Sequence, residues 1–428
     1  MDYLILPPEQ MLETQVQLPL SKSESARRMI MDAVSHTVSP GPVADCDDIR
    51  VLADALAADA ASGATVDVGA SGTALRFLTT YFAATPGTDI TIDGCERLRQ
   101  RPLSILIDAL RAMGADIECL GSEGFAPVRI RGRQLAGGDI EIDASVSSQF
   151  VSALMMMGPT MAAPLNITLT NNIASAPYIR MTALMMEARG ADVEIAGQTV
   201  HVRPGAYTLP GGPVTADWSA ASYWYAITAV SAGWVTLPGL EENSLQGDSA
   251  MRRYGEQLGV NTDFDDEDTP DAAVLSASPE QYGRITLDMT GTPDLVPAIA
   301  VAACTLGIPF HFTGLATLHD KECDRVAALQ QEMLRLGCIL EAEDRDSLAW
   351  DGRRAVVTTR PVIDTHGDHR MAMAFACVAI FVPGIVIRDI EVVDKSYPGF
   401  WRDLTAAGFT LHEWTGEPQQ PAEEEAQT

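Results

Sequence analysis

The sequence is poor in lysine and in long apolar runs, and each shortage excludes a class of protein. Its 428 residues include only three lysines. Lys and Arg together number 29 and Asp and Glu together 58, which gives a net charge of −29. Nucleic acids and anionic membranes are bound by excess positive charge, so this composition repels both. No apolar run approaches the ~18 residues that a membrane-spanning helix needs. We therefore expect no nucleic acid and no membrane among its partners.

Paired cysteines are also lacking. The seven cysteines are scattered, odd in number and free of any Cys-x-x-Cys spacing, which argues against a disulfide framework and against a zinc knuckle. Nothing matches the Walker A loop, and no His, Cys and Asp cluster has metal-ligand spacing. The first residues, Met1-Asp2-Tyr3-Leu4, lack the basic segment and apolar core of a signal peptide. These features predict a cytoplasmic globular protein.

The three lysines, Lys22, Lys321 and Lys395, are the first positive indication of function. A chain of this charge repels a negatively charged ligand, so any anion site must be a concentrated local exception. One interpretation is that the lysines have persisted by chance on solvated faces. The other is that they share such a site, and the motifs around them decide between the two.

A helix-like stretch, a glycine and a short alternating strand recur along the chain at intervals of roughly 70–78 residues. Glycine is favoured where a helix ends in a left-handed turn before a strand. Six such units predict an α/β (α+β) fold of two similar domains with three helix–strand units each. Gly211-Gly212-Pro213 is the best signal for a linker between them. The glycines of the repeat are Gly114, Gly190, Gly259, Gly337 and Gly408, and 51–68 is a shorter sixth copy.

Four predicted helices begin with polar or basic residues. A helix N-terminus has free N–H donors and a partial positive charge, so it is suited to binding an anion. Ordinary capping by Ser and Asp is the better explanation of any single start. Four starts, two of them with a single cation each, favour anion binding as the joint interpretation. The starts are Ser21 to Arg27, Gly69 to Arg76, Ser147-Ser148-Gln149 and Asp368-His369-Arg370.

Further cations follow in the sequence. Lys321 and Arg325 are four residues apart, so on a helix they would share one face, which is repulsive unless an anion bridges them. The alternative is a surface ion network with neighbouring acidic residues such as Glu322. Arg101 is predicted to begin a helix, and Lys395 to lie in a loop before the last helix. Arginine gives bidentate contacts and lysine a mobile charge, so these cations suit a phosphate and carboxylates.

With these motifs assembled, the chain resembles the 5-enolpyruvylshikimate-3-phosphate synthases, a family of enolpyruvyl transferases. The resemblance implies two inverse α/β-barrel-like domains with the active site in the cleft between them. The implied domains are 19–214 and, discontinuously, 1–18 with 215–414, followed by a disordered acidic tail at 415–428. We expect the acidic run 263–271 to be a solvated loop. The motifs that carry the resemblance are SKSESAR, SGTALR, RLRQRP, SSQF, SAPY, PDLVPAIA, DKECDR, DHRMAM and DKSYP, in this order.

The resemblance implies a reaction between two small anions, shikimate 3-phosphate and phosphoenolpyruvate. The 5-hydroxyl of the first adds to C2 of the second while C3 takes a proton, and phosphate then leaves. Asp294 would accept the hydroxyl proton, and Glu322, with Lys22 and Lys395 nearby, would protonate C3. No metal or organic cofactor is needed, and a monomer is expected. Shikimate 3-phosphate is expected to meet Lys22, Ser23, Arg27, Ser147, Ser148, Gln149, Ser175, Tyr178, Asp294, Thr317 and Lys321. Phosphoenolpyruvate is expected to meet Lys22, Gly72, Arg101, Gln149, Arg325, Arg370 and Lys395.

Four positions depart from the family pattern. Leu20 replaces a Gly at a crossing between the domains and bears on hinge flexibility. Ala70 and Thr317 replace Asn residues near the phosphate, where the threonine hydroxyl can partly substitute. Phe77 replaces a Pro close to Gly72. None of these changes removes a catalytic group.

Two alternatives stay open. The sister transferase that acts on UDP-N-acetylglucosamine uses a cysteine in the loop before its Arg-Pro, and Cys95 lies six residues before Arg101. The motifs SSQF and DKECDR favour the shikimate enzymes over this sister. A non-catalytic protein that binds phosphorylated metabolites would need the cations and serines, but neither Asp294 nor Glu322.

Overall fold

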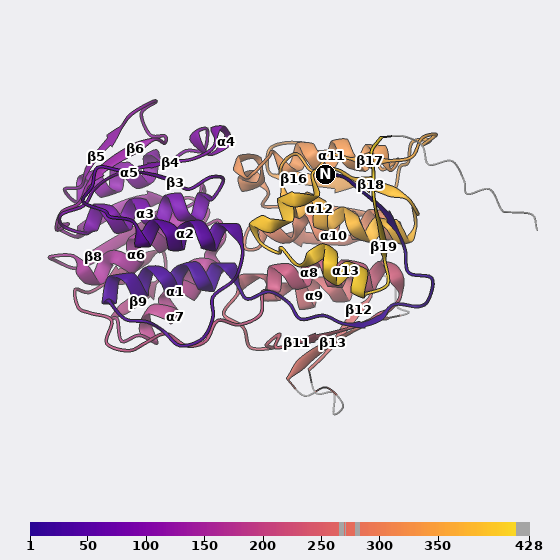
Figure 1. Cartoon of the computed structure of the whole chain (residues 1–428), viewed down its shortest axis with the longest axis horizontal. Coiled ribbons are helices and arrows are strands. Elements are labelled where there is room, and N and C mark those ends of the chain that lie inside the picture. Colours follow the sequence, from indigo (N-terminus) through magenta and orange to yellow (C-terminus); the bar gives the residue numbers. More distant parts are fainter. Residues whose placement is uncertain (265–268, 270, 279–282, 417–428) are drawn as a thin grey trace, which may run out of the picture.

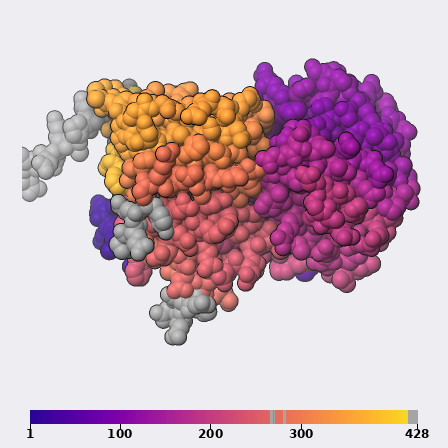
Figure 2. Space-filling model, turned by 180° about the vertical axis from the view of Figure 1, so that it is seen from behind, coloured from indigo at the N-terminus to yellow at the C-terminus, as the bar shows by residue number. Residues whose placement is uncertain are grey.

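The computed structural model describes residues 1–264, 269, 271–278 and 283–416. Figure 1 shows two lobes side by side, with the indigo N-terminal segment running along the second. From behind, the two lobes meet along a broad boundary (Figure 2). Most of the acidic run 263–271 and of the tail 415–428 lies outside the described residues. The solvated loop and the disordered tail therefore stay predictions.

The first lobe packs its helices against two four-stranded sheets. Only β3–β4 and β7–β8 are parallel pairs, and α3 and α6 supply the crossovers that parallel neighbours require. The helices are α1 (Lys22–Ser35), α2 (Asp47–Ala57), α3 (Gly72–Ala84), α4 (Glu96–Arg99), α5 (Ser104–Ala112), α6 (Ser148–Met157) and α7 (Ala176–Glu187). One sheet has the order β3 (Thr65–Asp67), β4 (Asp89–Asp93), β6 (Val128–Arg131), β5 (Asp116–Cys119). The other has the order β7 (Gly138–Asp143), β8 (Leu165–Thr170), β10 (Thr199–Val202), β9 (Val193–Ala196).

The second lobe has three sheets, two of which include a strand from the N-terminal segment of the chain. Its helices are α8 (Trp218–Ser231), α9 (Met251–Gln257), α10 (Val296–Leu306), α11 (Arg325–Arg335), α12 (His369–Ala376) and α13 (Phe400–Ala406). The first sheet is β12 (Val260–Asp263), β13 (Ala272–Ala277), β11 (Trp234–Pro238), β2 (Glu13–Gln15). The second is β14 (Ile285–Asp288), β15 (Phe310–Thr313), β16 (Ser347–Trp350). The third is β17 (Val362–Ile363), β18 (Ile385–Ile387), β1 (Tyr3–Leu6), β19 (Thr410–Glu413).

The predicted repeat of helix, glycine and strand is present in most of its copies. It joins α5 to β5, α7 to β9, α9 to β12 and α13 to β19, with a positive φ at Gly114, Gly190, Gly259 and Gly408. The shorter copy predicted at 51–68 is also present, because α2 leads through Gly63, with φ 70°, into β3. Gly337 also turns, with φ 85°, but the strand predicted after it is wrong. That stretch forms only isolated bridges, at Cys338 and Glu341. Pairing at single positions is too short to make a strand there.

The chain crosses between the lobes near Leu20 and again near Ala216, and the two crossings lie side by side. These residues form an isolated antiparallel bridge, and the Ser21 N–H donates to the Thr215 carbonyl at 2.8 Å. The second crossing directly follows the linker predicted at Gly211-Gly212-Pro213.

Each lobe has its own hydrophobic core. Three helices, α6, α8 and α10, are apolar on nearly all sides and are buried along almost their whole length, as such helices must be. One core draws on residues from Ala26 to Tyr207, and the other on Ile5–Leu18 and on residues from Ala216 to Phe409. The exact domain bounds expected from the sequence stay a prediction. None of the described helices is both long enough and apolar enough to cross a bilayer.

Candidate active site

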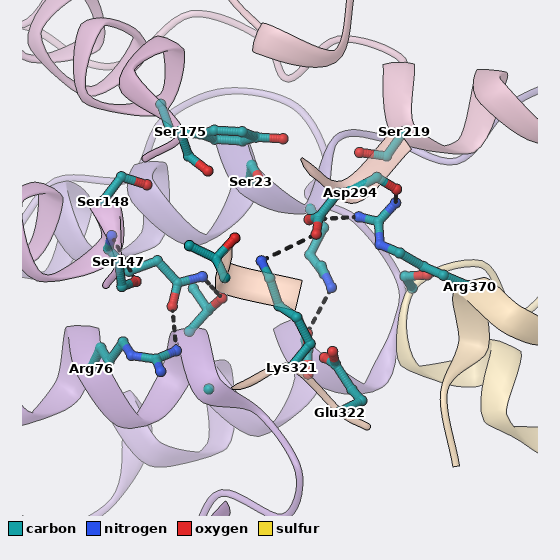
Figure 3. Close-up of a pocket in the computed structure, with 18 of the residues that line it drawn as sticks. Ser23, Arg76, Ser147, Ser148, Ser175, Ser219, Asp294, Lys321, Glu322 and Arg370 are labelled. Carbon is teal, nitrogen blue, oxygen red and sulfur yellow. Dashed lines mark hydrogen bonds and ion pairs between the residues drawn. The ribbon is translucent and has the colours of Figure 1, made fainter. Parts of the chain in front are cut away.

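A cleft between the two lobes brings the predicted site residues together (Figure 3). It encloses about 1310 Å³, including the solvent at its mouth. Their roles toward a substrate stay predictions, but their convergence is a finding. All of them except Lys395 line the cleft: Lys22, Ser23, Arg27, Gly72, Arg101, Ser147, Ser148, Gln149, Ser175, Tyr178, Asp294, Thr317, Lys321, Glu322, Arg325 and Arg370.

The four predicted helix starts lie at this cleft. α1, α3, α6 and α12 are capped by side chains that accept a backbone N–H, namely those of Ser21, Ser71, Ser147 and Asp368. Residues just after each cap line the cleft, namely Lys22, Gly72, Ser148 and Arg370. Capping and lining thus involve neighbouring residues of one helix start. The sequence alone left open whether these residues cap their helices or line a ligand site, and the structure is compatible with both roles.

The wall from the first lobe presents hydroxyl and amide groups, shown on the left of Figure 3. The hydroxyls of Ser23, Ser148 and Ser175 have no hydrogen-bond partner among the described residues, and all three serines line the cleft. Gln149 is held in place, since its Oε1 accepts from Arg76 at 2.7 Å and its Nε2 donates to Thr73 at 3.0 Å. The serine hydroxyls are thus available to a ligand.

Three arginines of this wall, Arg27, Arg76 and Arg101, are buried and pair with no carboxylate of the described residues. Burial lowers the pKa of Arg27 to about 10. Burial and repulsion from Arg101 lower the pKa of Arg76. A Cβ at Gly72 would lie 2.6 Å from Arg101 Nη1 and 2.7 Å from Arg76 Nη1, so glycine lets both guanidiniums approach the start of α3. Buried cations without a counter-charge favour binding of an anion.

The wall from the second lobe is built around Asp294, on the right of Figure 3. Its Oδ1 lies 3.1 Å from Lys321 Nζ and 2.8 Å from Arg325 Nη1, and its Oδ2 lies 3.0 Å from Arg370 Nη2. Burial raises the pKa of Asp294, but the three cations outweigh burial and hold the pKa well below its usual range. Asp294 is therefore ionised, and it partly neutralises each cation.

Arg325 also joins two further carboxylates. Its Nε donates to Asp368 at 2.7 Å and its Nη2 to Glu322 at 2.9 Å. Burial raises the pKa of Glu322, but attraction from Arg325, Lys395 and Arg101 outweighs burial and lowers the pKa well below its usual range. Glu322 is ionised in this arrangement, whereas the proton-donor role expected of it needs the protonated form.

Two local predictions are wrong. Lys321 and Arg325 do not share a helical face, because α11 begins at Arg325 with Asp324 as its cap. An aspartate that caps a helix start competes with continuation of the helix through it. The two cations are nevertheless bridged by an anion, the carboxylate of Asp294. Arg101 lies between α4 and α5, so it begins neither helix.

Lys22 and Lys321 line the cleft and Lys395 pairs with Asp48 of its lining, so the interpretation that the lysines persist on solvated faces is wrong. The Nζ atoms of Lys22 and Lys395 lie 2.8 and 2.9 Å from the carboxylate of Asp48. Lys395 ends a 3-10 helix (Ile390–Lys395) where a loop was predicted, and its Nζ lies 3.7 Å from Glu322. The same Nζ donates to the Ala70 carbonyl at 2.9 Å, a contact that does not depend on the side chain at position 70.

The sequence did not indicate several lining residues. Arg76 and His369 lie inside the predicted helix starts, so those motifs contain the signal for them. Asp48 has no such signal, because α2 is remote in sequence from the lysine of the other lobe with which it pairs. Thr317, by contrast, was expected at the site, and its buried hydroxyl has no partner among the described residues. The other polar lining residues not indicated are Thr73, Asp217, Ser219, Tyr223, Asp320, Ser396 and Tyr397.

Known proteins similar to this chain point to one family. The family model described as EPSP synthase (3-phosphoshikimate 1-carboxyvinyltransferase) matches residues 54–404. The 3-phosphoshikimate 1-carboxyvinyltransferase of Bacteroides fragilis is 44% identical over 414 residues, which cover 96% of this chain and 99% of that protein. The same enzyme of Methanoculleus marisnigri is 38% identical over 82% of this chain and 81% of its own.

The fold is shared with a solved structure. EPSP synthase from Acinetobacter baumannii matches with a TM-score of 0.74 at 22% identity, over 96% of this chain and 100% of that one. This likeness confirms the predicted α/β fold class. The resemblance inferred from the sequence motifs is confirmed as well: the chain belongs to the EPSP synthase family of enzymes, the 3-phosphoshikimate 1-carboxyvinyltransferases.

Proposed function

We propose that this chain transfers the enolpyruvyl group of phosphoenolpyruvate to the 5-hydroxyl of shikimate 3-phosphate and releases phosphate. The observation that carries the proposal is the cleft itself. On one side it is lined by side chains of the first lobe that suit an anion, and on the other by carboxylates of the second lobe that pair with cations. Membership of the family supports the same reaction. The proposed enzyme acts in the cytoplasm as a monomer and uses no cofactor.

The wall from the first lobe holds shikimate 3-phosphate in this proposal. The available hydroxyls of Ser148 and Ser175 donate to its phosphate, and the buried Arg27 adds positive charge behind them. These hydroxyls suit a phosphate because they can donate hydrogen bonds to its oxygens without first breaking a contact with a carboxylate of the protein. Tyr178 and Gln149 contact the ring, which sets its 5-hydroxyl toward the second lobe.

Phosphoenolpyruvate enters between this first substrate and the second lobe. Its carboxylate and phosphate are held by Lys22, Arg101, Arg325, Arg370 and Lys395. Guanidinium groups bind such anions in bidentate fashion. Because Arg325 and Arg370 already contact Asp294, the substrate competes with that carboxylate for them.

The reaction proceeds by addition and then elimination. Asp294 takes the proton of the 5-hydroxyl as the oxygen bonds to C2 of phosphoenolpyruvate, and Glu322 gives a proton to C3. The tetrahedral intermediate then expels phosphate while C3 returns a proton to Glu322. Surrounding cations stabilise the negative charge of the transition states throughout.

Substrate binding also adjusts the two carboxylates. In the structure both are ionised because cations surround them. A substrate phosphate or carboxylate brings negative charge beside Glu322 and shares Arg325 and Lys395 with it. Both effects raise the pKa of Glu322, so the glutamate takes up a proton when the substrates bind.

The test is phosphate release from the purified chain with phosphoenolpyruvate and shikimate 3-phosphate. Release that requires both substrates supports the proposal. Release with UDP-N-acetylglucosamine instead would indicate the sister transferase, which Cys95 does not favour because it is exposed and lies outside the cleft lining. Binding of both ligands without phosphate release would indicate a binding protein.

A further inference from the structure

Arg97 of the first lobe holds the backbone of the second lobe beside two residues of the site. It lies on α4, at the edge of the first lobe that faces the second (Figure 1). Its Nε donates to the Lys321 carbonyl at 3.2 Å, and its Nη2 donates to the same carbonyl at 3.0 Å. The Nη2 also donates to the His319 carbonyl at 3.2 Å.

The three arginines of this short segment contact three different parts of the molecule. Arg99 is half exposed, and its Nη2 lies 2.6 Å from a carboxylate oxygen of Asp93 in its own lobe. Arg101 is buried and lines the cleft. Arg97 pairs with no carboxylate of the described residues and contacts carbonyls of the other lobe. A surface ion network does not account for it.

The carbonyl that Arg97 contacts twice belongs to the peptide bond between Lys321 and Glu322. From this peptide the two side chains extend into the cleft, where Lys321 reaches Asp294 at 3.1 Å and Glu322 reaches Arg325 at 2.9 Å. The stretch lies between a 3-10 helix that ends at residue 320 and the start of α11. It has no regular secondary structure of its own, so contacts from outside determine where its peptides lie.

We propose that Arg97 is a positioning residue of the reaction, which fixes the peptide between Lys321 and Glu322 from the opposite lobe. The contact exists only while the lobes are together. The placement of both side chains therefore depends on the approach of the lobes. This inference rests on the proposed function, because it takes Lys321 and Glu322 to act on the substrates.

Three variants test the inference: Arg97→Ala, Arg97→Lys and Arg99→Ala as the matched control from the same helix. Phosphate release gives kcat and KM for each substrate, and thermal unfolding gives Tm. We expect Arg97→Ala to lower kcat/KM for phosphoenolpyruvate about 10- to 100-fold, because misplaced catalytic groups cost rates of this order. Arg97→Lys should recover part of the loss, since lysine donates to one carbonyl but lacks the planar fork. Arg99→Ala should stay within about twofold of the wild type.

Tm distinguishes positioning from a general structural role. A change of less than about 2 °C in Arg97→Ala, together with the loss in kcat/KM, supports positioning. Kinetic constants of Arg97→Ala within about twofold of the wild type would overturn the inference, as would an equal loss in Arg99→Ala. If Arg97→Ala does not fold, wild-type kinetics in Arg97→Lys overturn it too. A wild-type protein that releases no phosphate would contradict the proposed function. An active wild type with an unaffected Arg97→Ala variant would contradict only this inference.

Discussion

The two walls of the cleft differ in how their charges are paired. The wall from the first lobe has four cations and one carboxylate, namely Lys22, Arg27, Arg76 and Arg101 against Asp48. The wall from the second lobe has three cations and four carboxylates, namely Lys321, Arg325 and Arg370 against Asp217, Asp294, Asp320 and Glu322. Subtraction gives +3 for the first wall and −1 for the second, in a chain whose net charge is −29.

This difference suits the first wall to binding an anion and the second to proton transfer. Burial lowers the pKa of Arg27, a sign of a cation that lacks a counter-charge. Burial also lowers the pKa of Arg370, but Asp294 and its neighbours outweigh burial and raise it well above its usual range, a sign of a cation that already has one. The first wall therefore gains most from an incoming anion, whereas the second must exchange internal ion pairs for it. Changes in the first wall should affect KM, and changes to the carboxylates of the second, Asp294 and Glu322, should affect kcat.

The largest effect is expected for Asp294→Asn, which removes the proposed base from the second wall. We expect kcat to fall about 10³-fold, within the usual range for loss of an acid or base. Binding of shikimate 3-phosphate should persist, because the amide no longer neutralises the three cations around it. Phosphate release at saturating substrates and calorimetric titration measure the two quantities. Weak binding with normal turnover at saturation would place Asp294 in binding instead.

A smaller loss in kcat is expected for Glu322→Gln, about 10²-fold, because nearby Lys22 and Lys395 can supply a proton in its place. The amide keeps the shape of the side chain and can still contact Arg325. Steady-state kinetics with each substrate varied separate kcat from KM. A change confined to the KM of phosphoenolpyruvate would contradict the proton-transfer role.

The first wall is tested by the pair Ser148→Ala and Ser175→Ala. Both hydroxyls lack partners among the described residues, so their loss leaves no buried donor or acceptor of the protein unpaired. We expect KM for shikimate 3-phosphate to rise about tenfold per serine, as for a hydrogen bond to a charged group, with kcat kept. The exposed Ser122→Ala is the control. A loss of kcat at unchanged KM would remove the distinction between the walls.

Residues of the two walls were predictable from the sequence to different degrees. The helix starts at Ser21 and Ser147 were predictable, because capping serines precede apolar helices. The placement of Lys321 was not, because a four-residue spacing indicates one helical face only where the helix is unbroken. Asp324 caps α11 and breaks it. The cap signal was present in the sequence, but the spacing of the two cations concealed it.

Contacts between lobes were beyond prediction from local patterns. Asp48 pairs with Lys395, and Arg97 contacts the Lys321 carbonyl, across separations of 347 and 224 residues. Neither residue belongs to a run whose composition or spacing points to the other lobe. What fixes these pairs is the mutual placement of two separately packed cores, which a periodicity of hydrophobic residues does not encode.

The smallest effect concerns stability, and it again separates the walls. His369, in the second wall, is 1% exposed, and neither ring nitrogen has a hydrogen-bond partner among the described residues. Burial lowers its pKa to about 3, with opposing attraction from Asp368 and Glu322 and added repulsion from Lys22 and Arg370. The unfolded chain takes up this proton near pH 6.5, so His369 costs stability as pH falls from there toward 3.

At pH 5 this cost is about 2 kcal/mol, from a difference of about 1.5 pH units at 1.36 kcal/mol each. Asp248 acts in the opposite direction, because burial raises its pKa to about 6, so the wild type alone does not isolate the histidine. Denaturant unfolding of both the wild type and His369→Gln, at pH 7.5 and at pH 5, isolates the contribution of the histidine. The wild type should lose about 2 kcal/mol more than the variant between the two pH values. Equal losses would mean that His369 is protonated in the folded protein, which adds positive charge to the second wall and weakens the contrast with the first.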